Sequence, residues 1–247
     1  RGVTGTPKTL VVRREGHRWR AFMVCEMDQP EPLPSTDHEV GLDRGVVATV
    51  ATSDGYVVIA PRHLTHALDR LANAQQITER RQRGSNRHRH AGEAVGRLHR
   101  KIARQRRDHL HKLSRRLVNE YDLLVIEDLQ TANMVRRPKP RPNDEGGWDP
   151  NGAAAKAGLN RSILDSGWGI LEQMLVYKAE EAGRRLVRVN PRHTSQTCAA
   201  CGHVDAGNRV SQAEFRCLRC GHTDNADVNA AIDILRAGRA QQQTIAA

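Results

Sequence analysis

Four cysteines near the end of this 247-residue chain constrain its fold more than any other feature. They form two CxxC pairs, Cys198 with Cys201 and Cys217 with Cys220, and fifteen residues separate the pairs. Each pair can wrap a tight turn around one side of a tetrahedral Zn2+ ion, so the spacing predicts a zinc ribbon over residues 193–222 with one structural Zn2+. Disulfide pairing of the four cysteines is the alternative. The paired spacing and the lack of a secretory pattern favour zinc and a cytoplasmic, nucleoid-associated protein.

Positive charge is concentrated in the middle of the chain. The formal net charge is +11, and residues 79–116 contain fourteen Lys or Arg against three acids. Such a region predicts binding to a polyanion, above all to nucleic-acid phosphates, and a solvated helical face that only aids solubility is the alternative. Aromatic residues make up 3% of the chain, so base stacking should contribute little. No apolar run is long enough to span a bilayer, and no membrane partner is expected.

The order of apolar and polar residues predicts an α/β sheet with a cysteine-rich insertion before its last helix. Two alternating runs around Gly16 and His17 predict a β-hairpin, Thr9–Arg14 with Arg18–Cys25. The further predicted strands are Val40–Thr52, Tyr56–Ile59, Leu123–Ile126 and Leu186–Val189. The predicted helical parts are 64–119 with a break near 84–86, Ile163–Ala182 with Ile163, Ile170, Met174 and Tyr177 facing inward, and Asp224–Arg236 before a frayed end. Residues 134–158 are expected to form a loop.

Two of the predicted strands carry a carboxylate at a position where a buried acid is unfavourable unless it binds a ligand. Asp43 lies between two glycines in the first strand of the predicted sheet, and small neighbours would let a metal ion and a phosphate approach the backbone. A simple turn is the alternative for an Asp beside Gly. Glu127 ends a buried strand and shares one face with Leu123 and Val125. A strand-end carboxylate that merely reaches solvent is the alternative for Glu127.

The third carboxylate, Asp227, opens the last predicted helix. Thr223 or Asp224 can cap that helix, which places Asp227 in its first turn. A small apolar stripe suited to close packing on a sheet continues from Asp227 at helical spacing, through Ala230, Ala231 and Ile234. Asp233 is expected to face away from that stripe. Of the acids in this segment, Asp227 is the one predicted to face inward.

Two strand acids and one helix acid that meet at a sheet edge can hold two divalent cations. Such a pair activates a water molecule and stabilises the leaving oxygen of a phosphodiester. Oxygen ligands favour Mg2+ or Mn2+ over Zn2+, so this predicted site is chemically distinct from the cysteine site. The chain has no GxxxxGK[ST] loop, and Cys25 has no His placed to activate it, so neither triphosphate hydrolysis nor a nucleophilic triad is supported.

Four motifs carry a family resemblance: Gly41-Leu-Asp43-Arg-Gly45, Val125-Ile-Glu127-Asp-Leu129, Asn190-Pro-Arg-His-Thr-Ser-Gln-Thr-Cys198-Ala-Ala-Cys201-Gly, and Cys217-Leu-Arg-Cys220-Gly with Asp227-Val-Asn-Ala-Ala231. In order and spacing the sequence resembles the C-terminal half of the TnpB family. These are RNA-guided endonucleases encoded by insertion sequences, and they are related to compact type V CRISPR effectors.

The resemblance implies an RNase H-like, RuvC-type mixed sheet with flanking helices, a basic helical hairpin and a zinc-ribbon insertion. It implies that Asp43, Glu127 and Asp227 are the catalytic acids and bind Mg2+ or Mn2+, and that Arg192 contacts substrate phosphate. The implied partners are a guide RNA and a double-stranded DNA target. The implied domains are the closing hairpin and linker of a truncated N-terminal β-barrel (1–36), the nuclease domain (37–192) with its basic hairpin (64–119), the ribbon (193–222) and a last helix with its tail (223–247).

The sequence thus predicts a metal-dependent DNA endonuclease of a transposable element, RNA-guided in its full-length form. Two alternatives stay open at this point. One is a truncated or regulatory nucleic-acid-binding module without cleavage, which would use the basic helices alone. The other is a guide-independent nuclease that selects branched DNA by its structure.

Overall fold

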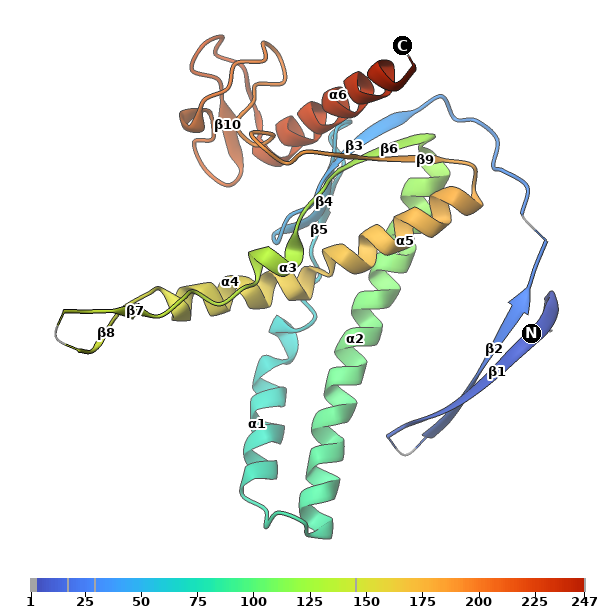
Figure 1. Ribbon diagram of the computed structural model, residues 1–247, viewed down its shortest axis with the longest axis vertical. Helices are drawn as coiled ribbons and strands as arrows, with labels where there is room; N and C mark the ends of the chain where they lie inside the picture. The colour runs from blue at the N-terminus through green and yellow to red at the C-terminus, as the bar shows by residue number, and fades with distance from the viewer. Residues whose placement is uncertain (1–3, 17, 29, 145, 247) are drawn as a thin grey trace. The chain divides into compact units, whose positions relative to one another are not determined.

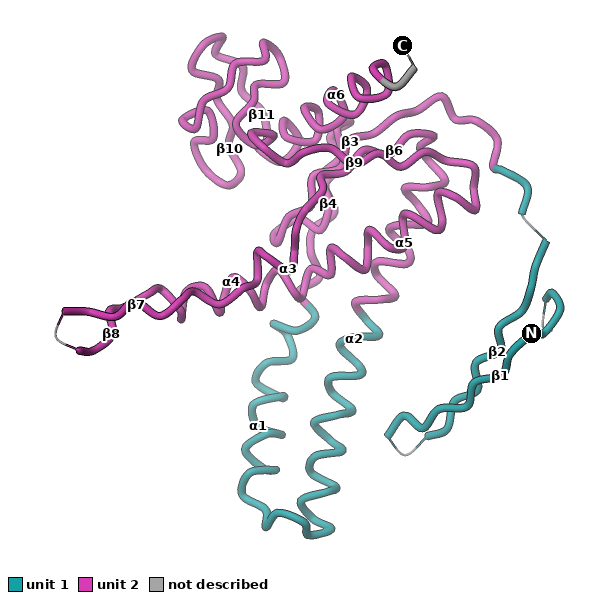
Figure 2. Tube along the Cα trace, viewed as in Figure 1, with its two compact units in different colours: residues 1–32, 63–105 teal, residues 33–62, 106–247 magenta. Residues whose placement is uncertain are grey.

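The computed structural model describes residues 4–16, 18–28, 30–144 and 146–246. The chain divides into two compact units, which Figure 2 shows in different colours. Unit 1 contains residues 1–32 and 63–105, and unit 2 contains residues 33–62 and 106–247. In the part of the chain that is described, no helix is both long enough and apolar enough to pass through a bilayer.

Unit 1 begins with an antiparallel hairpin of β1 (Thr6–Glu15) and β2 (Arg18–Glu26), which confirms the predicted pair of strands. The predicted turn residue His17 lies outside the described residues. Leu10 pairs with Met23, and the register shifts between Pro7 and Thr9. Apolar side chains on both faces of this ribbon are exposed, including Leu10, Val11, Val12, Trp19, Phe22, Met23 and Val24.

Unit 1 also holds the start of the basic helical region. The short 3-10 turn η1 (Thr65–Ala67) leads into α1 (Leu68–Glu79), and α2 (Asn86–Glu120) follows and ends in unit 2. The break lies where it was predicted, because Gly84 adopts a positive φ of 83° and the Ser85 hydroxyl accepts a hydrogen bond from the backbone N–H of His88.

Unit 2 is built on a five-stranded mixed sheet. Its strands are β3 (Glu39–Asp43), β4 (Ala48–Thr52), β5 (Val57–Ile59), β6 (Leu123–Glu127) and β9 (Arg185–Val189), in the order β5-β4-β3-β6-β9. Strands β3, β6 and β9 are parallel to one another, and β4 runs antiparallel to its neighbours β3 and β5. The predicted single strand Val40–Thr52 is wrong, because a turn at residues 44–47 folds it into the β3–β4 pair.

Helices cover both faces of this sheet (Figure 1). On one face, the unit-2 part of α2 and helix α5 (Trp168–Glu181) bury a core with β3, β4 and β6 that includes Val40, Leu42, Leu113, Leu117, Leu124, Ile126, Leu171 and Leu175. On the other face, α6 (Ala226–Ala246) packs with a smaller core of Leu123, Val125, Val189, Ile234 and Leu235. Leu123 and Val125 therefore share the α6 face, as the alternation of strand side chains predicted.

The predicted helix Ile163–Ala182 is two helices. The helix α4 (Ala153–Ser166) ends at Gly167, which has a φ of 70°, and α5 begins directly after it. A Cβ atom at position 167 would lie 2.9 Å from a Leu110 methyl group, so the break also allows close packing on α2. Ile163 and Met174 are buried as predicted, whereas Ile170 and Tyr177 are exposed, so their inward placement is wrong.

The predicted loop over 134–158 also contains regular structure. A single helical turn, α3 (Thr131–Met134), precedes it, and β7 (Arg141–Pro142) pairs with β8 (Trp148–Asp149) before α4 starts at Ala153. The prediction of a structureless loop is therefore wrong for this small hairpin and for the first turns of α4.

The last helix starts near its predicted position but runs on to Ala246, so the predicted frayed end is wrong. Its N-cap is Asn225, whose Oδ1 accepts hydrogen bonds from the backbone N–H groups of Asp227 and Val228, rather than Asp224 or Thr223. Ala230, Ala231 and Ile234 are buried as predicted. Asp233 is buried too, which contradicts its predicted outward position, and it pairs with Arg236 one turn later.

Candidate metal centres

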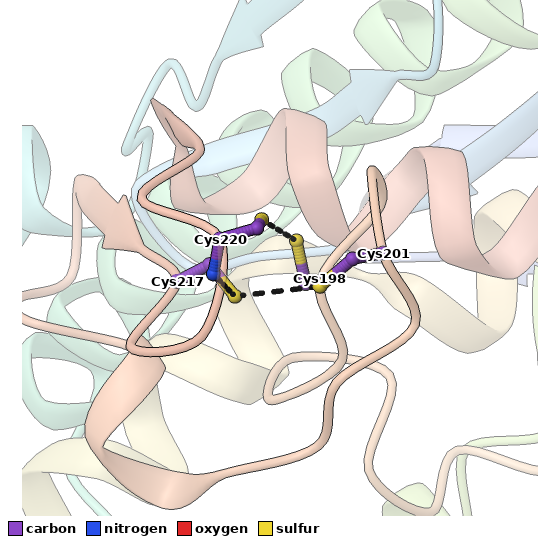
Figure 3. Close-up of side chains that lie close together, drawn as sticks. All are labelled: Cys198, Cys201, Cys217 and Cys220. Atoms are coloured by element: carbon purple, nitrogen blue, oxygen red, sulfur yellow. Dashed lines mark hydrogen bonds between the residues drawn. The ribbon is translucent and has the colours of Figure 1, made fainter.

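The four cysteines converge on one point (Figure 3). Their sulfur atoms all lie within 4.8 Å of one another, with 3.7 Å between those of Cys198 and Cys220 and 3.6 Å between those of Cys201 and Cys217. A tetrahedron with Zn–S bonds of about 2.3 Å has S–S edges of about 3.8 Å. The cluster therefore has the size and the donor set of a four-thiolate zinc site.

Matching turns hold the two cysteine pairs. In each CxxCG motif the carbonyl of the first cysteine accepts a hydrogen bond from the glycine N–H, and Gly202 and Gly221 have φ values of 72° and 74°. Burial raises the pKa of the Cys217 thiol, but hydrogen bonds from the backbone N–H groups of Cys220 and Arg219 and with the thiols of Cys220 and Cys201 together outweigh it and lower that pKa to about 6. The turn thus favours a thiolate, which is the form that binds a metal ion.

The three predicted catalytic acids share one edge of the unit-2 sheet. Asp43 and Glu127 are the last residues of the parallel neighbours β3 and β6, whose preceding residues Leu42 and Ile126 are paired. Glu127 follows Leu123 and Val125 on the α6 face. Asp43 shares a face with Gly41, where an added Cβ would lie 2.0 Å from the carbonyl oxygen of Ala231 in α6. Asp227 lies in the first turn of the same helix.

The electrostatics of these acids reflect that closeness. Burial raises the pKa of Asp43 to about 7, with further contributions from the negative charges of Glu127 and Asp227, while Arg209 and Arg44 oppose the shift. Burial also raises the pKa of Glu127, against the Thr194 hydrogen bond and the Arg44 charge. Mutually repelling, desolvated carboxylates are a donor set that a divalent cation fits. Within the described residues these acids do not reach the 4.8 Å mutual spacing of the cysteine sulfurs.

Gly41 has a packing role that differs from the one expected. The sequence predicted that the glycines beside Asp43 leave room for a metal ion and a phosphate. At Gly41 the room is instead filled by the backbone of α6, since an added Cβ would also lie 2.7 Å from the N atom of Leu235. The absence of a side chain brings α6, and with it Asp227, close to the strand that carries Asp43.

Arg44 is a buried cation that the sequence analysis missed. Its side chain is 1% exposed, donates to the main-chain carbonyl of Glu127 and forms a 2.9 Å ion pair with Glu172 of α5. Glu172 also pairs with Arg188 of β9 at 2.8 Å. A buried charge is stable only when it is paired and hydrogen-bonded, and this one connects the ends of β3 and β6. The position of Arg44 directly after Asp43 in the sequence was the feature that could have identified it as part of the site.

Two side chains from the segment around the cysteines contact the acids and were also missed. The Thr194 hydroxyl donates to Oε1 of Glu127 at 2.5 Å, and Arg209 pairs with Asp227 at 2.9 Å. Neither is near its partner in sequence, so no local pattern could reveal them. The predicted phosphate contact Arg192 is exposed, and its Nε donates to the His193 ring at 3.1 Å. Among the described contacts none joins Arg192 to the three acids, and its assignment stays a prediction.

A buried asparagine joins the cysteine-rich segment to α6. The Asn229 side chain is fully buried, donates to the carbonyl of Thr197 at 2.8 Å and accepts from the N–H of Ala199 at 2.9 Å. This satisfied amide gives a physical role to the Asn of the Asp227-Val-Asn-Ala-Ala231 motif. It fixes the start of α6 to the turn that begins the cysteine cluster.

Two family models match separate parts of the chain. Residues 22–137 match the family model OrfB_IS605, described as a probable transposase, and residues 168–234 match the Cas12f1-like TNB domain. The second match contains the four cysteines, Asn229 and Asp227. A protein named "CRISPR-associated endodeoxyribonuclease Cas12f1" from Sulfoacidibacillus thermotolerans is 52% identical over 64 residues, which are 26% of this chain and 15% of that protein.

Longer relatives align along nearly the whole chain. "Putative RNA-guided DNA endonuclease InsQ" of Escherichia coli K12 is 38% identical over 97% of this chain and 59% of its own length. A "Putative RNA-guided DNA endonuclease" of Streptomyces pristinaespiralis is 36% identical over 95% of this chain and 54% of its own. The chain therefore spans a little over half the length of these curated relatives.

Solved structures share the fold at low sequence identity. A Cas12f1 chain from a complex with single guide RNA and target DNA superposes with a TM-score of 0.53 and 18% identity, over 91% of this chain and 55% of that one. A second Cas12f ternary complex gives a TM-score of 0.52 at 18% identity, over 88% of this chain and 42% of that one. With both domain matches and relatives that align along nearly its whole length, this chain belongs to the TnpB family.

Proposed function

We propose that this chain carries the phosphodiester-cleaving centre of a metal-dependent DNA endonuclease of an insertion sequence, which is RNA-guided in its full-length form. The activity named for the curated relatives belongs to proteins of which this chain matches 54–59%, so its transfer to this chain is part of the proposal. The observation that carries it is the placement of three buried or half-buried acids at one end of the sheet, since Asp43 and Glu127 end the parallel neighbours β3 and β6 and Asp227 lies in the first turn of α6, which packs on them.

In this proposal Asp43, Glu127 and Asp227 hold Mg2+ or Mn2+, which when bound would activate water and stabilise the leaving oxygen of a phosphodiester. Other residues of the chain position these three acids. Arg44 holds the strand end that carries Glu127, and Gly41 lets α6 approach with Asp227. Arg209 already neutralises part of the negative charge at Asp227. The four cysteines hold a structural Zn2+ that fixes the ribbon beside these acids.

Nucleic acid is the proposed partner, as guide RNA and double-stranded DNA target. Unit 1 supports this with a cavity of about 370 Å3 lined by Glu15, Arg18, Arg97, Arg100, Lys101, Arg104 and Gln105. Glu15 pairs with Arg104 and Arg20, and within the described residues no ion pair joins Arg97, Arg100 or Lys101 to an acid. Such unneutralised cations favour contact with a phosphate backbone.

The finer architecture belongs to the same proposal. A five-stranded mixed sheet with acids at the ends of two parallel neighbours and on the last helix supports an RNase H-like, RuvC-type domain. We also propose residues 1–36 as the hairpin and linker that end a preceding β-barrel module, 37–192 as the nuclease domain, 193–222 as the ribbon and 223–247 as its last helix and tail.

The test compares cleavage of labelled DNA by wild type and by Asp43→Asn, Glu127→Gln and Asp227→Asn, with and without Mg2+ and with and without RNA from the same element. Each variant removes one charge with little change of shape and should lose cleavage while it keeps its circular dichroism spectrum. Asp128→Asn is the matched control, because Asp128 neighbours Glu127 in sequence but is exposed. Wild-type cleavage by Asp227→Asn would refute the assignment of the acids.

The same experiment addresses the two other functions considered. Retention of DNA or RNA on a filter, falling steeply with salt and without any cleavage in Mg2+, would favour a binding module. Cleavage of branched DNA without RNA would favour a structure-selective nuclease.

A further inference from the structure

The side chain of Thr194 makes a short hydrogen bond to the carboxylate of Glu127, one of the three acids. Thr194 is 5% exposed, and its hydroxyl oxygen lies 2.5 Å from Oε1 of Glu127, which is itself 7% exposed. A separation of 2.5–2.7 Å is typical of a hydroxyl that donates to an ionised carboxylate. The same hydroxyl lies 3.0 Å from the carbonyl of Pro191, a weaker second acceptor.

The backbone that presents this hydroxyl is strained. His193, the residue directly before Thr194, has a φ of 66°, in the left-handed region that a non-glycine residue adopts only when its surroundings hold it there. The turn around it is held by several bonds, since the His193 carbonyl accepts from the N–H groups of Gln196 and Thr197. Upstream, Oδ1 of Asn190 accepts from the N–H of Arg192 at 2.9 Å. Strain that is retained and supported in this way is typical of a functional turn.

Glu127 is thereby fixed at both ends. Arg44 donates to its main-chain carbonyl, and Thr194 donates to one of its two carboxylate oxygens. A glutamate side chain has three rotatable bonds, so without a partner its carboxylate would sample several positions. With Oε1 occupied by the hydroxyl, Oε2 is the oxygen left to face the acids of β3 and α6.

The geometry points to Thr194 as a positioning residue for the carboxylate site: its hydroxyl holds Oε1 of Glu127 so that the other oxygen is presented to a divalent cation shared with Asp43 and Asp227. This inference rests on the proposed function and deepens it. Hydrogen-bond partners of metal-ligating carboxylates commonly change metal affinity or activity by about 10–100-fold when they are removed. Thr194 itself touches neither substrate nor metal.

The test uses four substitutions in the zinc-loaded chain, one of which is Glu127→Gln, which removes the charge of the carboxylate itself. Thr194→Val keeps the shape of the side chain and removes the hydroxyl, and Thr194→Ser keeps the hydroxyl and removes the methyl group. Thr197→Val is the matched control, because the Thr197 hydroxyl donates at 2.8 Å to the carbonyl of His193 in the same turn and contacts none of the three acids. Mn2+ binding is measured by calorimetry and electron paramagnetic resonance, together with thermal unfolding and the Mg2+ dependence of DNA cleavage.

Thr194→Val should bind Mn2+ about 10–100-fold more weakly than wild type, whereas Thr194→Ser and Thr197→Val should stay within about threefold. Equal Mn2+ affinity in wild type and Thr194→Val would overturn the inference. So would equal losses in Thr194→Val and Thr197→Val, because both would then act through the turn alone. If Glu127→Gln bound Mn2+ as tightly as wild type does, the proposed carboxylate site itself would be overturned, and the inference with it.

Discussion

Replacing Asp43 with Asn should stabilise the fold while it abolishes the proposed activity. The carboxyl has an ordinary pKa near 3.8 and a pKa of about 7 in the folded chain, because burial and the charges of Glu127 and Asp227 disfavour its ionised form. The folded chain therefore binds this proton more tightly than the unfolded chain does. Stability must then fall as the pH rises from about 4 to about 7, where Asp43 ionises in the unfolded chain but not in the fold.

The expected size follows from the same two pKa values. One pKa unit corresponds to about 1.4 kcal/mol, so the penalty from Asp43 is about 1–2 kcal/mol at pH 5 and about 4 kcal/mol at pH 8. Asparagine does not titrate, and the cost of burying its amide is the same at both pH values. The free energy of unfolding of Asp43→Asn, measured relative to wild type, should therefore increase by about 2–3 kcal/mol between pH 5 and pH 8.

Urea denaturation of both proteins at pH 5 and pH 8, with zinc supplied but no other divalent cation, measures this difference. The exposed Asp128→Asn is the control and should show a much smaller change between the two pH values. Adding Mg2+ at pH 8 should stabilise wild type more than Asp43→Asn, because only the complete set of acids binds it well. A wild-type stability that does not decline relative to Asp43→Asn as pH rises would refute the idea that burial and the neighbouring charges together disfavour the ionised form of Asp43.

The remaining predictions concern packing, zinc and acid stability. Gly41→Ala should cost about 3 kcal/mol in urea denaturation, because its Cβ would lie 2.0 Å from a carbonyl of α6. In contrast, Gly158 is exposed in α4 and has nothing within 4 Å of an added Cβ, so Gly158→Ala should raise the free energy of unfolding by up to about 1 kcal/mol. Equal effects of Gly41→Ala and Gly158→Ala would contradict the close approach of α6 to β3. Chelation of zinc should expose residues 198–220 and the start of α6 to limited proteolysis, and unchanged fragments would argue against a structural metal. The Ser35 hydroxyl, helped by the N–H groups of Thr36 and Asp37, holds the pKa of Asp122 below its usual range. The stabilisation by Asp122 should thus be full at pH 7 and decrease progressively as the pH falls below about 4 toward the lowered pKa, so Asp122→Asn should destabilise the fold clearly more at pH 7 than at pH 2. Equal losses at the two pH values would contradict the argument.

The sequence predicted those parts of the fold whose signals are local. Two CxxC pairs at fixed spacing, a buried run that ends in Glu127 and a small-residue stripe after Asp227 each describe a few consecutive residues. The structure has the cysteine cluster, the strand β6 and the inward face of α6 at those places. Glycine at 84 likewise marked the break between α1 and α2, since a positive φ is a local property.

The predictions of the fold were wrong where contacts between residues far apart in the sequence determine the structure. Nothing near Asp43 shows that Val40–Thr52 must fold back, because the turn is set by pairing of Leu42 with Thr52. The break at Gly167 depends on α2 packing against it, and the burial of Asp233 is set by the helix surroundings and its Arg236 partner. Arg44, Thr194 and Arg209 reach their acids only through the folded chain. A sequence pattern can identify carboxylates suited to a metal, but the groups that orient them require the tertiary structure.

The hairpin of β1 and β2 has a practical consequence for every assay above. Among the described residues no further strand pairs with this two-stranded ribbon, and a ribbon with leucine, valine and tryptophan side chains in water and unpaired edges is a template for self-association. At low ionic strength the net charge of +11 keeps copies apart, but at about 0.5–1 M salt the screening length shrinks to a few ångströms. The salt that releases bound nucleic acid would then also promote aggregation, so light scattering should accompany every salt titration to distinguish dissociation from precipitation.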